Sequence, residues 1–407
     1  MIGTVAHISS LDTQVRVVAG IRSDNCCACA GGEKAMRKEV HMNINRPSRK
    51  VIAGSVFAVL MAAGAALPTS YLVQQPGPVL DVTSTMDGKE VVDVTGIPTH
   101  DSDTHFLMTT VTSLGNSESG IPAVVVAKAL LSSDEVVPVR ALYPSDVSAK
   151  EVHERNVALM NTSQDTAAAV ALEQAGLDVS MTLRVAGVPA GSPAEGVFEE
   201  GDILKAIETR DRGAKVTTFR TLSQVLDNAA PGSEVKVTVE RDGREQTLTA
   251  TTRGYDPDVT GWLHPGSALG VFVEVTDVKL PADVSYVVEG IGGPSAGLMF
   301  TLAIYDAVTP GSLGGHKTIA GTGAIAWDGD VEPIGGIRHK MAGARDAGAT
   351  DFLAPAFNCP ETIGYEPEGL NVWAVRTIDE AIAATKAIGA GHTESLTPCS
   401  ALPAVER

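Results

Sequence analysis

The sequence is poor in basic residues, in aromatic side chains and in cysteine. Its 31 Lys and Arg stand against 49 Asp and Glu, which gives a formal net charge of −18 at pH 7. Nucleic-acid binding depends on a basic surface that displaces counterions, so we expect no nucleic-acid partner. Aromatic residues make up 4% of the chain and hydrophobic residues 44%. This balance indicates globular domains with aliphatic cores, and 407 residues are enough for two or three of them.

Metal-binding motifs are missing as well. Three of the five cysteines crowd into residues 26–29, where no further ligands follow at a regular spacing. His153 and Glu154 lack the second histidine of the H-E-x-x-H zinc motif. We therefore predict neither a metal site nor a cofactor. The other two cysteines, Cys359 and Cys399, allow a disulfide if their part of the chain lies outside the cytoplasm.

One long uncharged run interrupts the polar N-terminal part, VIAGSVFAVLMAAGAAL at 51–67. After a Pro-Thr-Ser break, the apolar residues YLV at 71–73 extend it. Basic residues precede the run at 46–50, and the acidic Asp81 and Asp87 follow it. Because basic flanks stay on the cytoplasmic side, the run predicts a membrane-spanning helix with its N-terminus inside.

We predict a single-pass anchor at 51–73 in the cytoplasmic membrane, with the rest of the chain outside. A cleaved signal peptide is the alternative, since the small residues at 63–65 stand at a suitable spacing. Residues 1–50 would form a cytoplasmic segment. Residues 1–41 show no steady period, while Met42 begins MNINRPSRK, a short basic lead into the apolar run. We therefore expect translation to start at Met42, with 1–41 a mis-assigned start.

Residues 74–176 combine strand-like stretches with one long helix. Strands are predicted at 88–96, 105–112 and 122–131, because these stretches are rich in β-branched and apolar residues and are bounded by turn residues. A helix is predicted from about 149 to 176, where apolar residues recur with a period of about 3.6.

The segment 177–254 has the element order of a small binding module. An alternating strand, VSMTLRVAGV, leads into GSPAEGVFEEGDILKAIE, and TFRTLSQVLDNA predicts a short amphipathic helix. Two alternating strands follow around Asp242 and Gly243, a strong hairpin signal. The segment resembles a PDZ domain of the bacterial protease-associated type, which implies that it binds an extended peptide at a sheet edge. A spacer without a tight ligand is the alternative.

Strands and helices alternate again in 255–390. A helix is predicted to begin at Pro294 and Ser295 and to stop at 310–311, and another is predicted at IRHKMAGARDAG. The predicted strands are VFVEVTDV, DVSYVVEG, TIAGTGAIAW, DVEPIGG, TDFLAPAF and NVWAV, and TIDE at 377–380 is a capping box for the last helix. Residues 391–407 are expected to form a loose tail.

The stretch IGGPSAGLM places Ser295 at the start of an apolar helix. Pro294 suits a first helical turn and Gly293 lets the backbone come close to another chain, so free N–H groups surround the hydroxyl. Together with Ala296, these residues fit an oxyanion hole beside a nucleophile. A simple helix cap is the alternative, since serine is a favoured residue at helix starts.

A nucleophilic serine needs a base to take its proton, whereas a helix cap does not, so a candidate base would favour the nucleophile. His264, His316 and His339 are candidates for a Ser-His-Asp triad, but none stands in a recognisable triad motif and G-x-S-x-G is absent. Lys340 is the other candidate, because its predicted helix has an apolar face around it. Burial disfavours the ammonium form, so a buried lysine can be neutral near pH 7 and act as a base. A solvated surface lysine is the alternative.

Taken in order, these motifs resemble the proteolytic domain of the Lon family of Ser-Lys proteases, over about 270–390. The matching stretches are Gly293-Pro294-Ser295-Ala296-Gly297, Thr322-Gly323, and Pro333-Ile334-Gly335-Gly336 followed by Lys340. The resemblance implies that Ser295 is the nucleophile and Lys340 the general base. It also implies that Thr322 hydrogen-bonds and orients the lysine, and that backbone N–H groups around Ser295 stabilise the oxyanion.

The chain departs from ATP-dependent Lon enzymes in two places. Ile291 and Gly292 stand where those enzymes carry Lys-Asp, and Ala324 stands where a glutamate is common. Neither change removes a catalytic group. The nearest match to a nucleotide-binding loop is GSLGGHKT at 311–318, which has His316 in place of glycine and precedes a predicted strand, so we expect no nucleotide site there.

The predicted fold class is α+β: a Lon-type proteolytic domain of mixed sheets and packed helices plus a PDZ domain, after one transmembrane helix. Residues 74–176 would supply the N-terminal part of the protease fold and 255–390 the rest, with the PDZ domain inserted at 177–254. The resemblance also implies homo-oligomers, a hexameric ring by analogy.

Two functions are consistent with these observations. The first is an ATP-independent serine endopeptidase that cuts unfolded or flexible protein segments outside the cytoplasmic membrane, with the PDZ domain for substrate binding or regulation. The second is a PDZ-based membrane adaptor whose protease fold is inactive. The presence of Ser295, Lys340 and Thr322 favours the peptidase.

Overall fold

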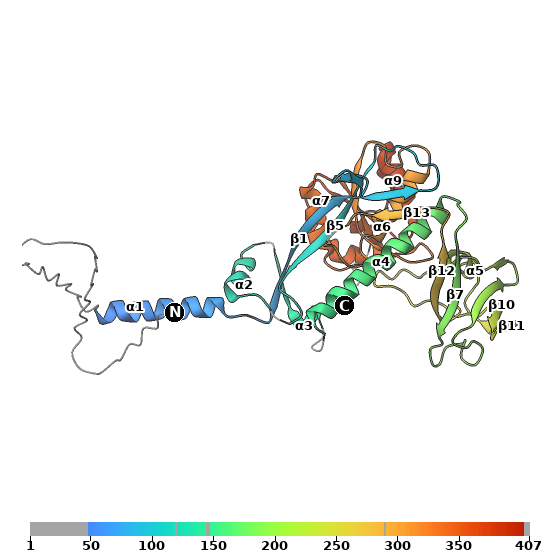
Figure 1. The fold of residues 1–407 in the computed structure, drawn as a ribbon, viewed down its shortest axis with the longest axis horizontal. Coiled ribbons are helices and arrows are strands. Elements are labelled where there is room, and N and C mark those ends of the chain that lie inside the picture. Colours follow the sequence, from blue (N-terminus) through green and yellow to red (C-terminus); the bar gives the residue numbers. More distant parts are fainter. Residues whose placement is uncertain (1–47, 119, 133, 144–146, 289, 403–407) are drawn as a thin grey trace, which may run out of the picture. The chain divides into compact units, whose positions relative to one another are not determined.

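The structure, a computed structural model of the chain, describes residues 48–118, 120–132, 134–143, 147–288 and 290–402 (Figure 1). Contacts divide the chain into two compact units, 1–57 and 58–407. The expected start at Met42, the cysteines at 26–29 and nearly all of the expected cytoplasmic segment lie outside the described residues.

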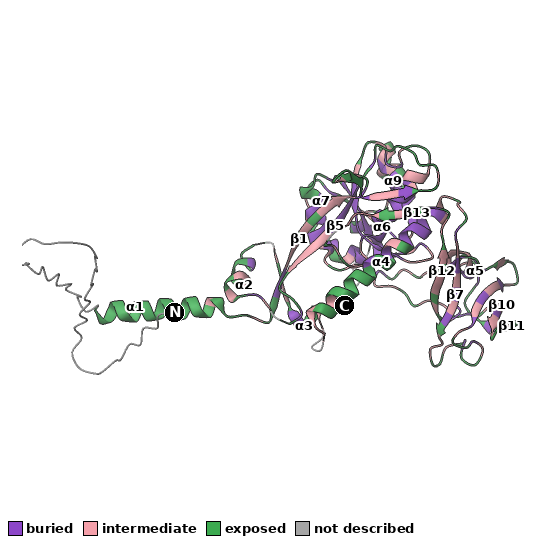
Figure 2. Cartoon of the chain, in the orientation of Figure 1, coloured by how far each residue is buried: buried purple, intermediate pink, exposed green. Residues whose placement is uncertain are grey.

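The apolar run forms helix α1 (Arg49–Ala66), which is 18 residues long and has no buried residue (Figure 2). It is the one helix among the described residues that is long and apolar enough to cross a membrane. The predicted extension of this helix to residue 73 is wrong. Leu72 and Val73 lie in strand β1 (Tyr71–Asp81) with 0% and 1% exposure, because Pro68 follows the helix and these side chains pack into a sheet.

Strands from both sides of the expected PDZ segment share one six-stranded sheet, in the order β18-β17-β14-β5-β1-β6. Its members are β1, β5 (His105–Leu114), β6 (Glu135–Pro138), β14 (Thr318–Gly321), β17 (Asp351–Pro355) and β18 (Asn371–Val375). β1 pairs antiparallel with β5 and β6, whereas β14 is parallel to β5 and β17, and β17 is parallel to β18. Parallel strands are usually covered on both faces, and every residue of β17 is buried.

Neighbouring side chains of β5 reach different cores on the two faces of this sheet. Phe106 and Met108 belong to a core with α6 (Gly297–Val308) and α9 (Ile378–Ala390). Leu107 belongs to a core with α7 (Ile337–Asp346). Because side chains alternate along a strand, α6 and α7 cover opposite faces of the sheet.

The long helix predicted at 149–176 is α4 (Ala149–Gln174). It begins with a capping box, in which the Ser148 side chain accepts from the Glu151 amide and the Glu151 carboxylate accepts from the Ser148 amide. Its C-terminal half is buried at 166–172 and contributes to two cores, one shared with α6 and one shared with the PDZ-type sheet. The helix therefore packs against both parts of the 58–407 unit.

The PDZ-type segment forms a second sheet, in the order β11-β10-β8-β7-β12, with β9 paired to β8. Its elements are β7 (Ser180–Gly187), β8 (Ile203–Glu208), β9 (Gly213–Lys215), α5 (Phe219–Leu226), β10 (Glu234–Arg241), β11 (Arg244–Thr251) and β12 (Phe272–Lys279). The predicted hairpin at Asp242 and Gly243 is confirmed, since both residues have positive φ and join β10 to β11. The sheet extends past the expected boundary at 254, because β12 pairs antiparallel with β7.

Residues 122–131, predicted as a strand, instead form helix α2 (Ala123–Ala129). Pro122 directly precedes the helix, alanine, lysine and leucine at 127–131 favour a helix, and tertiary packing overrides the β-propensity of the three valines. The predicted strand at 88–96 is divided between two short strands. The remaining elements are β2 (Thr85–Met86), β3 (Lys89–Glu90), β4 (Val92–Thr95), α3 (Val139–Leu142), β13 (Asp283–Tyr286), β15 (Ala324–Ile325), β16 (Val331–Glu332), η1 (Ala356–Asn358), α8 (Cys359–Thr362), η2 (Thr393–Ser395) and η3 (Cys399–Ala401).

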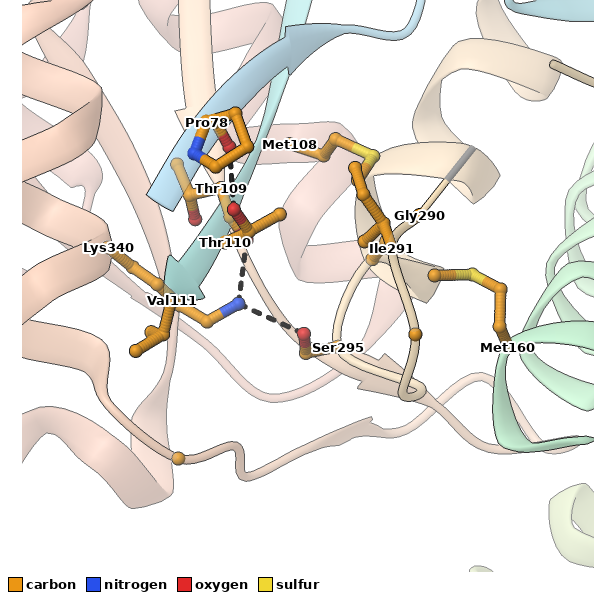
Figure 3. Close-up of a pocket in the computed structure, with 13 residues that line it drawn as sticks. Pro78, Met108, Thr109, Thr110, Val111, Met160, Gly290, Ile291, Ser295 and Lys340 are labelled. Carbon is orange, nitrogen blue, oxygen red and sulfur yellow. Dashed lines mark hydrogen bonds between the residues drawn. The ribbon is translucent and has the colours of Figure 1, made fainter. Parts of the chain in front are cut away.

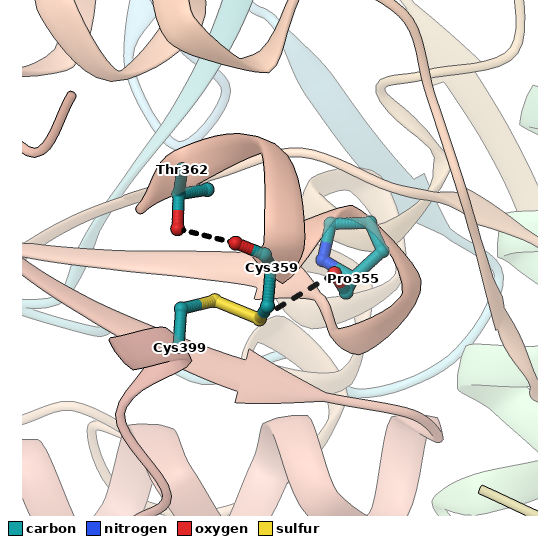
Figure 4. The surroundings of a disulfide bond; sticks show 4 residues. All are labelled: Pro355, Cys359, Thr362 and Cys399. Atoms are coloured by element: carbon teal, nitrogen blue, oxygen red, sulfur yellow. Dashed lines mark hydrogen bonds between the residues drawn. A yellow bond between two sulfur atoms is a disulfide. The ribbon is translucent and has the colours of Figure 1, made fainter. Parts of the chain in front are cut away.

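A disulfide joins Cys359, at the start of α8, to Cys399 in η3 (Figure 4). Both cysteines are 0% exposed and belong to the core under α7. The expectation of a loose tail from residue 391 is wrong as far as 402, because the Ala374 amide donates to the Thr397 carbonyl at 2.9 Å and the disulfide holds η3 in the core. Residues 403–407 lie outside the described part.

Candidate active site

Ser295 lies in a turn just before α6 and not inside the helix. The helix begins at Gly297, and its N-cap residue is Ala296, which makes no side-chain capping bond. The Ser295 hydroxyl instead accepts a hydrogen bond from the Lys340 ammonium nitrogen. A helix cap would need the Ser295 hydroxyl to accept from a backbone amide of α6, and the described residues show no such bond, so the helix-cap alternative is not supported. The predicted helix start is about three residues too early.

Helix α4 holds the loop before Ser295. The Gly293 amide donates to the Asn156 carbonyl at 2.9 Å, and the Ser163 hydroxyl donates to the Pro294 carbonyl at 2.9 Å. A side chain at Gly297 would meet Ser163 Oγ at 2.9 Å, so the start of α6 lies close against α4. These contacts fix the backbone on one side of the serine.

The link between β14 and β15 holds the serine from its other side. The Ser295 carbonyl accepts from Thr322 Oγ1 and from the Gly323 amide, both at 3.0 Å. Thr322 is 0% exposed, so both bonds are shielded from water. The backbone of Ser295 is therefore fixed independently of its hydroxyl.

Lys340 comes from α7, on the other face of the sheet. The N-cap of this helix is Gly336, at φ 70, and a side chain there would meet Val111 Cγ2 at 2.8 Å. Gly336, the second glycine of PIGG, thus allows the helix to start close against β5. Lys340 follows one turn later, and its Nζ donates to Ser295 Oγ at 2.9 Å and to the Thr109 carbonyl at 2.7 Å (Figure 3).

Burial lowers the pKa of Lys340 from 10.5 to about 7. The side chain is 3% exposed, and within the described residues no carboxylate pairs with it, so desolvation of the ammonium form is unopposed. A large fraction of the lysine is therefore neutral at neutral pH. The alternative of a solvated surface lysine is wrong.

Ser295 and Lys340 both line a cavity of about 240 Å³ (Figure 3). Met108, Met160 and Ile291 form an apolar part of its wall. The dyad atoms therefore face a space that is large enough for an amino-acid side chain and has few charged groups.

Two backbone N–H groups at the site have no acceptor. In the hydrogen bonds of the described residues, neither the Ser295 amide nor the Ala296 amide is a donor. Both amides lie at the N-terminal end of α6, where the helix dipole favours negative charge. They are the donors nearest to the serine that an anion could use.

Two contacts differ from the sequence-based expectation. Thr322 was expected to hydrogen-bond the lysine, but in the described structure its hydroxyl donates to the Ser295 carbonyl. The backbone carbonyl of Thr109 takes the place beside the lysine. Every residue has a backbone carbonyl, so a sequence motif could not have indicated this contact.

The histidine candidates all lie elsewhere. His316 is exposed and pairs with Asp103, and His264 pairs with Asp330. His339 neighbours Lys340 in sequence, but its Nε2 lies 3.3 Å from Glu135. None bonds to Ser295 in the described structure, and the same residues contain no group of three or more His, Cys, Asp or Glu placed to hold a metal ion.

A serine hydroxyl paired with a buried lysine of lowered pKa is the arrangement of Ser-Lys peptidases. Residues 287–386 match the model of the Lon protease (S16) C-terminal proteolytic domain, and residues 157–252 match that of the PDZ domain. The chain thus carries a Lon-type proteolytic domain and a PDZ domain. The second match begins within α4, before the expected boundary at residue 177.

Three relatives that match the C-terminal region are named as Lon proteases. The Lon protease of Lachnoclostridium phytofermentans is 37% identical over 93 residues, 22% of this chain and 11% of that protein. Lon protease 1 of Sorangium cellulosum is 38% identical over 94 residues, with the same two shares, and Lon protease 2 of Bacillus subtilis is 34% identical over 92 residues, 23% of this chain and 16% of that protein. The similarity therefore spans between a tenth and a sixth of these relatives.

Proposed function

We propose that the protein is an ATP-independent serine endopeptidase in which Ser295 is the nucleophile and Lys340 the general base. The observation that carries the proposal is the 2.9 Å contact between Lys340 Nζ and Ser295 Oγ, made by a lysine whose pKa burial lowers to about 7. A neutral amine at this distance can accept the hydroxyl proton, which an ordinary lysine cannot do at pH 7.

The reaction would proceed in two halves. Neutral Lys340 takes the proton of Ser295 as the oxygen attacks the scissile carbonyl carbon. The resulting ammonium then gives that proton to the leaving amine nitrogen, which leaves an acyl-enzyme. Water attacks this ester while Lys340 accepts a proton from it, and return of that proton to Ser295 Oγ releases the acid product.

The surrounding groups would support the charges that develop. The amides of Ser295 and Ala296 would donate to the oxyanion, and the loop at 293–294 holds those amides against α4. The Thr109 carbonyl, 2.7 Å from Nζ, would stabilise the ammonium when it forms. Thr322 would act as a positioning residue through the Ser295 carbonyl.

The substrates would be unfolded or flexible segments of proteins. The 311–318 stretch, the nearest match to a nucleotide-binding loop, leads into β14 instead of opening a helix, which supports ATP independence. The PDZ domain would bind or deliver an extended peptide. Assembly into a ring remains an analogy with other Lon-type domains.

We infer an extracytoplasmic location, with α1 as a single-pass anchor in the cytoplasmic membrane and the N-terminus inside. Helix α1 has the length and composition for this, and the basic residues at 46–50 precede it. The disulfide between Cys359 and Cys399 supports an oxidising compartment for the catalytic part. A cleaved signal sequence would give the same side of the membrane.

The rival function is a membrane adaptor whose protease fold is inactive. Hydrolysis of casein by the purified full chain discriminates the two, with Ser295→Ala as the test and Ser395→Ala, at an exposed serine in η2, as the matched control. We expect activity in the parent and in Ser395→Ala and none in Ser295→Ala. Equal hydrolysis by all three would refute the nucleophile, and no hydrolysis by the parent would favour the adaptor.

A further inference from the structure

Helix α2 begins directly beside the end of α1. The Ala123 amide donates to the Leu67 carbonyl at 3.1 Å, and Pro68 and Pro122 form an antiparallel bridge. A side chain at Gly120 would lie 2.2 Å from the Thr69 carbonyl, so the two segments are in tight backbone contact. The start of α2 is therefore fixed to the residue that follows α1.

One face of α2 is already used for packing. Val125, Val126 and Ala129 contact Val73 and Ile121 in a small core of their own. This core also takes in β6, so α2 is held against the N-terminal end of β1. The helix needs no further partner on that face to be stable in its place.

The other face of α2 is exposed (Figure 2). Val124 is 55% exposed, Leu130 69% and Leu131 91%. Val124, Ala127 and Lys128 follow the i, i+3, i+4 spacing of a single helix face, and all three are exposed. Leu130, the C-cap residue, and Leu131 follow in an exposed turn. The two exposed leucines directly after α2 are costly in water, because about 1.5–3 kcal/mol of burial energy is lost for each that stays unburied.

The depth of α1 in a membrane determines what α2 meets. At 1.5 Å per residue, 18 residues span about 27 Å, slightly less than a hydrocarbon core of about 30 Å. A span this short leaves Leu67 at the boundary between hydrocarbon and headgroups. Since α2 has seven residues and is about 10 Å long, all of it lies within reach of the headgroup layer.

We propose that the exposed face of α2, formed by Val124, Ala127 and Lys128, and the turn at Leu130 and Leu131 that follows it lie in the outer interface of the phospholipid bilayer. The proposal rests on the proposed anchoring by α1. The leucines would enter the acyl boundary, and Lys128 would extend its ammonium group to the lipid phosphates. The membrane would then hold the N-terminal end of β1. Since Pro78 of the same strand lines the catalytic cavity, β1 would also fix the distance between the cavity and the membrane surface.

The test is depth-dependent quenching of an added tryptophan in the full chain. Leu131→Trp and the control Phe272→Trp, a 65% exposed site in β12, are each reconstituted into phosphatidylcholine vesicles with and without brominated acyl chains. Fluorescence of the parent is subtracted to remove the native tryptophans. We expect brominated lipid to lower the added signal of Leu131→Trp at least twofold and to leave that of Phe272→Trp unchanged.

Flotation of the vesicles accompanies the quenching measurement and shows whether the chain is bound to them. A chain that floats with the vesicles but shows equal quenching at both positions overturns the docking of α2 and leaves the anchor standing. A chain that does not float overturns the anchor and the docking together. A blue shift of Leu131→Trp that depends on protein concentration and not on bromine assigns the face to a second copy of the chain, which also overturns the proposal.

Discussion

The rate of peptide hydrolysis should depend on pH through Lys340. A base with a pKa of about 7 is neutral in about 9% of molecules at pH 6, about 50% at pH 7 and about 91% at pH 8. A pKa of 10.5 would leave only about 0.03% neutral at pH 7. Burial of this one side chain therefore raises the active fraction more than a thousandfold, to the order of magnitude.

The assay is the initial rate of cleavage of a flexible fluorogenic peptide by the full chain between pH 6 and pH 9. Because only the neutral amine accepts the proton of Ser295, kcat/KM should rise about tenfold from pH 6 to pH 8 and level off above pH 8. Lys386→Ala, at an exposed lysine on α9, should give the same profile as the parent. A flat profile, or a rate that still rises tenfold per pH unit between pH 8 and pH 9, would refute the role assigned to Lys340.

Three further results are expected. The pKa of Lys340 is lower in the folded than in the unfolded chain, so its burial is most destabilising below about pH 7 and the penalty disappears as pH rises through 10.5. Lys340→Met should therefore raise the free energy of unfolding at pH 6 by a few kcal/mol in order of magnitude, and Tm with it, while activity is lost. The disulfide closes a loop with a sequence separation of 40, and by loop entropy this stabilises the folded chain by about 4 kcal/mol. A reductant should therefore lower the Tm of the parent and leave the Tm of the double variant Cys359→Ala/Cys399→Ala unchanged. Thr322→Val removes one hydrogen bond to the Ser295 carbonyl, worth about 1 kcal/mol, so kcat should fall about fivefold with little change in KM. Thr322→Ser should restore kcat, because it restores the hydroxyl. An unchanged kcat in Thr322→Val would contradict the positioning role.

The residues that the sequence brings forward for the site do meet in space. Ser295 and Lys340 are separated by 45 positions. Ser295 lies in the turn before α6, and Lys340 lies on α7 on the opposite face of the sheet, yet their reactive atoms lie 2.9 Å apart. The sequence could indicate this pair because both residues stand near glycines that the packing requires. A side chain at Gly297 or Gly336 would clash with neighbouring atoms, so both positions are glycine and can be recognised as part of a motif.

Other features could not be predicted because they depend on contacts between distant segments. The Thr109 carbonyl beside Lys340 belongs to the backbone, which every residue has. Strand β12 has the same alternating pattern whichever sheet it joins, so its pairing with β7 was not readable. The valines of α2 have a high β-propensity, and only their contacts with the core of β1 and β6 select the helix.

The position of the acyl group during turnover tests whether Ser295 is the nucleophile. The full chain is mixed with an activated peptide ester, quenched with acid within the first turnovers and digested for mass spectrometry. The proposed mechanism predicts a single acyl adduct on the peptide that contains Ser295, and none in Lys340→Ala at pH 7. An adduct on another residue, or turnover by Ser295→Ala at the rate of the parent, would contradict it.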